Sequence, residues 1–100
     1  MSEERILTKH PEGKTGVNIS REKYYAIKTS ILECLSEKEL TYTDLANCVG
    51  ETLKGKFEGS ISWYVEVVKL DLEARNVIER ISKTSLQLYR LKRVQNSFQR

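Results

Sequence analysis

Residues 59–76 constrain the fold more than any other stretch, because they have the length and the ends of one long helix. With a rotation of about 100° per residue, the apolar side chains of this helix fall on two opposite sides. One stripe holds Ile61, Val65, Val68 and Leu72, and the other holds Trp63, Val67, Leu70 and Ala74. Both stripes must be covered. We expect one to pack on other helices, and the second on a hairpin, on the N-terminal segment or on a second subunit.

Two shorter helices are predicted before this one. Ser20 is a suitable N-cap, and the residues after it carry apolar side chains at helical spacing, which predicts a helix over about residues 21–36. Residues 40–43 are short and β-prone, so we expect a brief strand there. Thr41 or Thr43 can then cap a second helix, whose apolar stripe is Leu45, Val49 and Leu53.

A β-hairpin is predicted after the long helix. Asn76 suits the position just after the helix, because asparagine tolerates the left-handed conformation. Residues 77–81 and 86–91 read as strands, joined by a polar turn. Residues 1–19 contain the only proline and two glycines close together, so we expect either a floppy arm or a strap across the domain. Residues 93–100 are expected to form a flexible basic tail.

These elements predict one α+β domain over residues 20–92, in the order helix-strand-helix-helix-strand-strand, with three helices and a small antiparallel sheet. The order resembles the winged-helix form of the helix-turn-helix, in which residues 54–59 are the turn and the final hairpin is the wing. A more specific resemblance is to an uncharacterised family of small prokaryotic winged-helix proteins. The residues that carry it are His10-Pro11, Gly13-Lys14, Lys23-Tyr24, Trp63-Tyr64, the run 68–75 and Tyr89-Arg90-Leu91. This resemblance implies a fold and no established activity.

Composition narrows the function without identifying it. A chain of 100 residues with 31% charged side chains is expected to be one small soluble domain. It has no apolar run long enough to cross a membrane and no visible signal peptide, so we expect a cytoplasmic protein. Cys34 and Cys48 are expected to be free buried thiols, because each lies among apolar neighbours in a helical pattern.

No catalytic or metal-binding constellation is visible. His10 is the only histidine, and it has no partner at metal-ligand spacing. The glycines at 13–16 and 55–59 do not form a phosphate-binding loop. We therefore predict that the protein is not an enzyme and that it has no cofactor and no metal.

The charge distribution suggests double-stranded DNA as a partner. Residues 33–73 hold four Lys/Arg and nine Asp/Glu, whereas residues 74–100 hold seven and one. A basic wing and the start of the long helix would then meet phosphates, as in a small transcriptional regulator. The residues predicted to contact DNA are Lys54, Lys56, Ser60, Ser62, Lys69, Arg80, Lys83, Arg90 and Lys92.

The chemistry of the long helix favours an alternative. Its most polar face, Ser62-Glu66-Lys69-Glu73, has a net charge of −1 and would be repelled by phosphates. The second apolar stripe offers Trp63, Val67 and Leu70 as an interface. The alternative function is therefore a winged-helix protein-interaction or dimerisation module that does not bind DNA, with a homodimer as one form of it.

Overall fold

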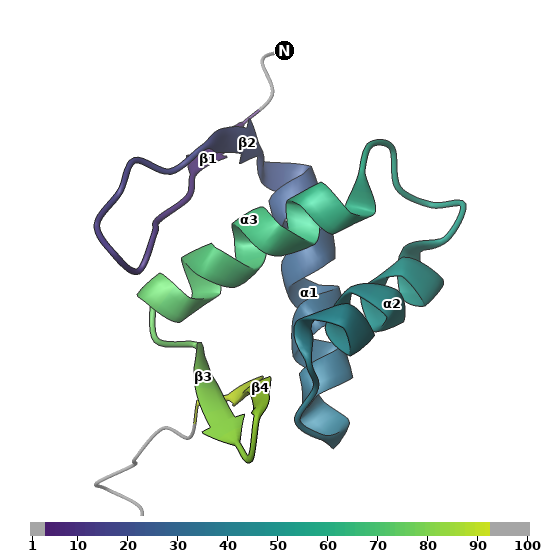
Figure 1. The fold of residues 1–100 in the computed structure, drawn as a ribbon. Helices are drawn as coiled ribbons and strands as arrows, with labels where there is room; N and C mark the ends of the chain where they lie inside the picture. The colour runs from purple at the N-terminus through teal and green to yellow at the C-terminus, as the bar shows by residue number, and fades with distance from the viewer. Residues whose placement is uncertain (1–3, 93–100) are drawn as a thin grey trace, which may run out of the picture.

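The computed structural model describes residues 4–92 and shows an α+β domain (Figure 1). Three helices are combined with two small antiparallel two-stranded sheets, in the order β-β-α-α-α-β-β. The elements are β1 Arg5–Leu7, β2 Asn18–Ser20, α1 Arg21–Glu37, α2 Tyr42–Leu53, α3 Ile61–Ala74, β3 Ile78–Lys83 and β4 Leu86–Leu91. The predicted tail 93–100 lies outside the described residues.

Each helix begins where a side-chain oxygen caps it. Ser20, Thr41 and Ser60 accept hydrogen bonds from the backbone N–H groups of Lys23, Asp44 and Trp63, respectively. Such caps satisfy N–H groups that have no partner within the helix. The prediction of three helices in these places is confirmed.

The core lies between the three helices and the final hairpin. The side chains that are fully shielded from solvent come from the stripes predicted for each helix, and they include Ile27, Ile31, Leu45, Val49, Val65, Val68 and Leu72. Ile78 and Tyr89 close the core from the hairpin. The first apolar stripe of α3 therefore packs as predicted.

The β3–β4 hairpin forms as predicted at the C-terminal end of α3 (Figure 1). Asn76 has φ 65°, which confirms the left-handed residue expected after the helix. The predicted strand at 40–43 is wrong. Only Leu40 pairs with the sheet, through hydrogen bonds with Tyr89, because Thr41 already caps α2 and Tyr42 begins it.

The described N-terminal residues form the strands β1 and β2 and the loop between them, and we call this segment the strap. β1 pairs with β2, a strand pair that the sequence did not predict as such. Gly16 lies so close to Thr8 that an added Cβ would fall 1.8 Å from the Thr8 carbonyl oxygen. Just beyond, the Lys9 backbone N–H donates to the Asp71 carboxylate of α3 at 2.8 Å.

Asp71 is the point at which the strap, α1 and α3 meet. Its side chain is fully buried. It accepts from the Tyr24 hydroxyl of α1 at 2.5 Å and forms an ion pair with Arg75 at 2.9 Å. Burial of a carboxylate is tolerated only when it is paired and hydrogen-bonded in this way. Asp71 therefore fixes where the strap lies on α3.

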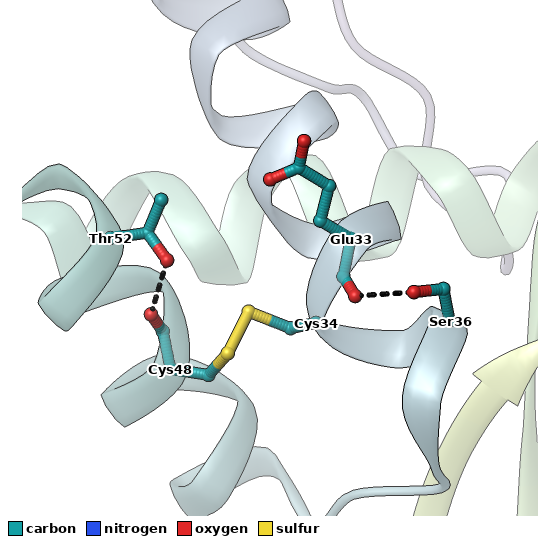
Figure 2. Close-up of a disulfide and its surroundings, with 5 residues drawn as sticks. All are labelled: Glu33, Cys34, Ser36, Cys48 and Thr52. Atoms are coloured by element: carbon teal, nitrogen blue, oxygen red, sulfur yellow. Dashed lines mark hydrogen bonds between the residues drawn. A yellow bond between two sulfur atoms is a disulfide. The ribbon is translucent and has the colours of Figure 1, made fainter.

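The expectation of free thiols is wrong, because Cys34 and Cys48 form a disulfide between α1 and α2 (Figure 2). Their Cα atoms lie 6.2 Å apart, a separation that a disulfide spans. Each cysteine follows the apolar pattern of its own helix. The sequence therefore predicts that both side chains are buried, but it does not predict that they bond to each other.

Among the described residues, no helix has the length and apolar character that a membrane crossing requires.

Reduction of the disulfide should destabilise the fold. The bridge spans a sequence separation of 14. A closed loop of this size limits the conformations that the unfolded chain can adopt. Opening the loop should therefore lower the free energy of unfolding by about 3 kcal/mol. Urea unfolding with and without dithiothreitol measures this difference. A Cys34→Ala/Cys48→Ala variant is the control and should not respond to the reductant, and equal stability of the native chain in both conditions would contradict the expectation.

High pH should destabilise the fold through Tyr24. Burial, followed by the hydrogen bond to Asp71, raises the pKa of Tyr24 above its ordinary value. In the unfolded chain tyrosine loses its proton near pH 10, whereas the folded chain still holds it. The stabilisation is therefore complete below about pH 10 and is lost as the pH rises above it. Urea unfolding at about pH 9 and pH 11 should show a smaller loss in Tyr24→Phe than in the native chain, and equal losses would show that Tyr24 is not the cause.

Candidate functional site

The surface around α3 holds most of the residues predicted to bind DNA or a protein. α3 packs its first stripe on α1 and α2, and its C-terminal half on β3. The first turn of α3 contains no acidic residue. The predicted site therefore consists of the turn before α3, the sides of α3 that remain outside the core, and the hairpin.

Lys69 does not occupy the place predicted for it. Only 2% of its surface is exposed. Its ammonium lies 3.1 Å from the Glu73 carboxylate, 3.7 Å from that of Glu66 and 4.8 Å from the centroid of the Tyr89 ring. A lysine enclosed by a carboxylate and an aromatic face is held within the protein. Lys69, one of the residues predicted to contact DNA, is therefore buried and paired within its own chain.

The cations of the hairpin are neutralised by carboxylates of the same chain. Arg80 binds Glu73 at 3.0 Å, and Lys83 binds Glu39 at 3.0 Å. Arg90 binds Glu79 at 2.7 Å and Glu39 at 3.5 Å. With the Lys69 pairs, four cations meet four carboxylates. The predicted basic wing therefore has no net positive charge in this network.

These ion pairs also shift the pKa values of Glu39 and Arg80. The hydrogen bond from Lys83 lowers the pKa of Glu39 below its ordinary value. The hydrogen bond to Glu73 raises the pKa of Arg80. Both shifts favour the charged forms, so the pairs persist over the ordinary pH range.

Of the remaining predicted DNA contacts, those before α3 lie at the end of that helix opposite the hairpin, whereas Lys92 adjoins the hairpin and donates its N–H to the Val77 carbonyl at 3.0 Å (Figure 1). Lys54 and Lys56 lie exposed in the turn before α3, and Lys92 lies exposed after β4. Within residues 4–92, these three lysines form no ion pair. The hydroxyls of Ser60 and Ser62 are exposed and 3.5 Å apart, and Ser60 is already used as the cap of α3. The free cations thus do not gather along α3 and the hairpin.

The second stripe of α3 is only partly covered, because Val67 belongs to the core while Trp63 remains exposed. Trp63 is 46% exposed and Leu70 is half-buried, whereas Val67 between them is 8% exposed. Trp63 meets the edge of the Tyr64 ring, which in turn meets Phe57, so its orientation is fixed by an aromatic cluster. The large apolar side chains of this stripe that remain open to solvent are therefore Trp63 and Leu70, which we call the α3 stripe.

Sequence reasoning missed that two charges of α3 are buried. Lys69 was assigned to the most polar face of the helix, yet it is enclosed on the hairpin side, and Asp71 is enclosed on the strap side. One signal was present in the chain, since Glu73 and Arg75 follow them at a spacing of four residues, where helical ion pairs form.

Within the described part of the chain, no group of three or more His, Cys, Asp or Glu side chains is arranged to hold a metal ion. The disulfide lies beside a groove between α1 and α2 that carries four carboxylates, those of Glu33, Glu37, Asp44 and Glu51. The close-up shows that the nearby hydroxyls are used locally: Thr52 donates to the Cys48 carbonyl and Ser36 to the Glu33 carbonyl (Figure 2).

Comparison with known proteins identifies one family. The model of a family of unknown function, DUF6958, matches residues 5–88. No curated protein and no solved structure matches the chain.

Replacement of Lys69 should affect stability far more than replacement of the exposed lysines. Lys69→Met keeps the aliphatic volume and removes the buried charge, which leaves Glu73 with Arg80 alone. We expect the free energy of unfolding to fall by about 3 kcal/mol, in the range for breaking a buried ion pair. Lys54→Ala is the matched control and should stay within about 0.5 kcal/mol of the native chain. Urea unfolding measures both, and an unchanged Lys69→Met variant would show that Lys69 does not hold the hairpin.

Proposed function

The chain belongs to the DUF6958 family, whose function is unknown, and from its own surface we propose that it is a winged-helix protein-interaction module that does not read DNA. In this proposal α2, the turn 54–60 and α3 are the helix-turn-helix, and the β3–β4 hairpin is the wing. The order of the elements and the position of the hairpin after α3 support it.

The observation that carries the proposal is the apolar character of the α3 stripe. A helix that reads DNA needs donors and acceptors for base edges on its outward side. α3 presents an indole and a leucine side chain there instead. An exposed tryptophan fixed by neighbouring aromatic rings is typical of an anchor in a protein interface. Covering this strip with an apolar partner surface would remove it from water.

The charges next to the α3 stripe support the same proposal. DNA binding gains affinity when free Lys and Arg side chains replace the counterions of the phosphates. In this chain Arg80, Lys83 and Arg90 would first have to leave their carboxylates. Glu66, which is exposed beside the stripe, would repel phosphates. The same carboxylate suits a protein partner that places a basic side chain at the rim of an apolar contact.

Truncating the exposed side chains of the α3 stripe should weaken binding of the partner without unfolding the chain. The variant Trp63→Ala/Leu70→Ser removes both exposed members of the strip. The matched control is Leu86→Ser, which changes a residue that is 55% exposed in the hairpin. The immobilised native chain is used to isolate a partner from extract of cells that express the protein. The purified partner should bind the double variant at least about 30-fold more weakly than the native chain, and the control equally well.

A direct DNA measurement separates this proposal from the alternative. Fluorescence anisotropy of a labelled mixed-sequence duplex is followed across a salt series, with the native chain and with Lys54→Ala/Lys56→Ala. We expect no saturable binding at micromolar protein. Binding that falls steeply with salt, and falls again in the lysine variant, would contradict the proposal and support a DNA-binding regulator.

A further inference from the structure

One edge of the hairpin is open. β3 is bonded to β4 on one side, and β4 is bonded to Leu40 on its other side. Among the described residues, no backbone group pairs with the outer side of β3. An open strand edge presents unpaired N–H and C=O groups that can pair with another strand.

The hydrogen-bond pattern shows which residues of β3 face outward. Tyr89 uses its N–H and C=O to bind Leu40, at 2.8 Å and 3.1 Å, so both groups point away from β3. In an antiparallel pair, two residues that lie opposite each other point their backbone N–H and C=O groups either both toward the neighbouring strand or both away from it. Arg80 is opposite Tyr89, so its backbone groups point to the open side, and those of Ser82 do so two residues later. A partner strand must therefore pair with Arg80 and Ser82.

The outer face of the hairpin is apolar at its centre and charged around it. Ile81 lies opposite Leu88 on the face turned away from the core, and neither belongs to the core packing. Glu79 and Lys83 lie two residues to either side of Ile81 on the same face. The pattern acid–apolar–base is therefore centred on Ile81 and is self-complementary when the strand is reversed.

We propose that β3 pairs in antiparallel fashion with β3 of a second copy of this chain, with the two-fold axis at Ile81. This register places Arg80 opposite Ser82 of the second copy, which joins the outward backbone groups. It also places Glu79 opposite Lys83 of the second copy. Ile81 meets its own copy in a non-hydrogen-bonded pair, where side chains lie closest. The result is a continuous sheet of four strands.

Neighbouring registers are less favourable. If the register shifts by one residue, Arg80 and Ser82 lie opposite residues of the second copy whose N–H and C=O groups point toward β4, so the backbone hydrogen bonds cannot form. A shift of two in one direction places Arg80 opposite Arg80 of the second copy, and like charges directly opposite are destabilising. The opposite shift places Lys83 against Ile81. Charged residues on an edge strand commonly prevent pairing, but here one register turns them into two attractive pairs.

The proposed register also extends interactions that are already present. Glu39, Arg90 and Glu79 form a row of alternating charge across the sheet. Lys83 already binds Glu39 of its own chain at 3.0 Å, so in the dimer its ammonium would lie between that carboxylate and Glu79 of the second copy. The adjacent row would contain Leu88 and Ile81 of both copies, which covers the apolar centre. This surface is separate from the α3 stripe, so the inference does not depend on the function proposed above.

Charge reversal tests the register. Sedimentation velocity of the native chain at about 100 µM should show a dimer in equilibrium with monomer. Glu79→Lys and Lys83→Glu should each bind themselves at least about tenfold more weakly, because symmetry repeats the unfavourable pair. An equimolar mixture of the two variants should form a heterodimer, because each lysine then meets a glutamate. Circular dichroism confirms that both variants are folded.

The mixture separates the proposed pairing from damage within each chain. Glu79→Lys also disturbs Arg90 of its own chain and Lys83→Glu also disturbs Glu39 of its own chain, and mixing cannot relieve either contact. Recovery of the dimer in the mixture would therefore support pairing between copies. A monomeric native chain, a dimer unaffected by Glu79→Lys, or a mixture that stays monomeric would overturn the proposal. Trp63→Ala/Leu70→Ser should leave the dimer unchanged, and its loss in that variant would place self-association on the α3 stripe instead.

Discussion

The buried Asp71 carboxylate holds together three parts of the chain that are far apart in sequence. It binds the strap through Lys9, α1 through Tyr24 and its own helix through Arg75. A buried carboxylate without these partners would be costly, so the three contacts form together or not at all. The position of the N-terminal segment thus follows from one charge on α3. With the strap on this side, the outward apolar side of the helix is limited to a narrow strip.

Lys69 performs the corresponding role on the other side of α3. It lies among Glu73, Tyr89 and Tyr42, and Glu73 is shared with Arg80 of the hairpin. Two of the cations predicted to contact DNA, Lys69 and Arg80, are therefore used to attach the hairpin to the helix. What remains for a partner is apolar side chains on α3 and an open strand edge on β3, both of which suit protein surfaces better than phosphates.

Local patterns predicted the helices because each helix carries its own information. Apolar spacing, the caps of α1 and α2 and the asparagine after α3 act within a few residues, and these were found where they were expected. The strand at 40–43 failed because a capping threonine competes for the same residues. The disulfide was missed because helical spacing shows that Cys34 and Cys48 are inward, and only the packing of α1 on α2 brings them together.

For the candidate site, the sequence determined which side chains lie on each side of α3, including the apolar strip with Trp63 and the flanking charges. The sequence of one helix cannot say which of its sides is left open, since that depends on where segments distant along the chain come to rest. The tertiary structure decided that Lys69 and Asp71 are covered, that the cations of the hairpin meet carboxylates, and that Trp63 stays exposed. The physical reason is that a charge is available for binding only when no nearer opposite charge holds it, and that distance is set by the fold.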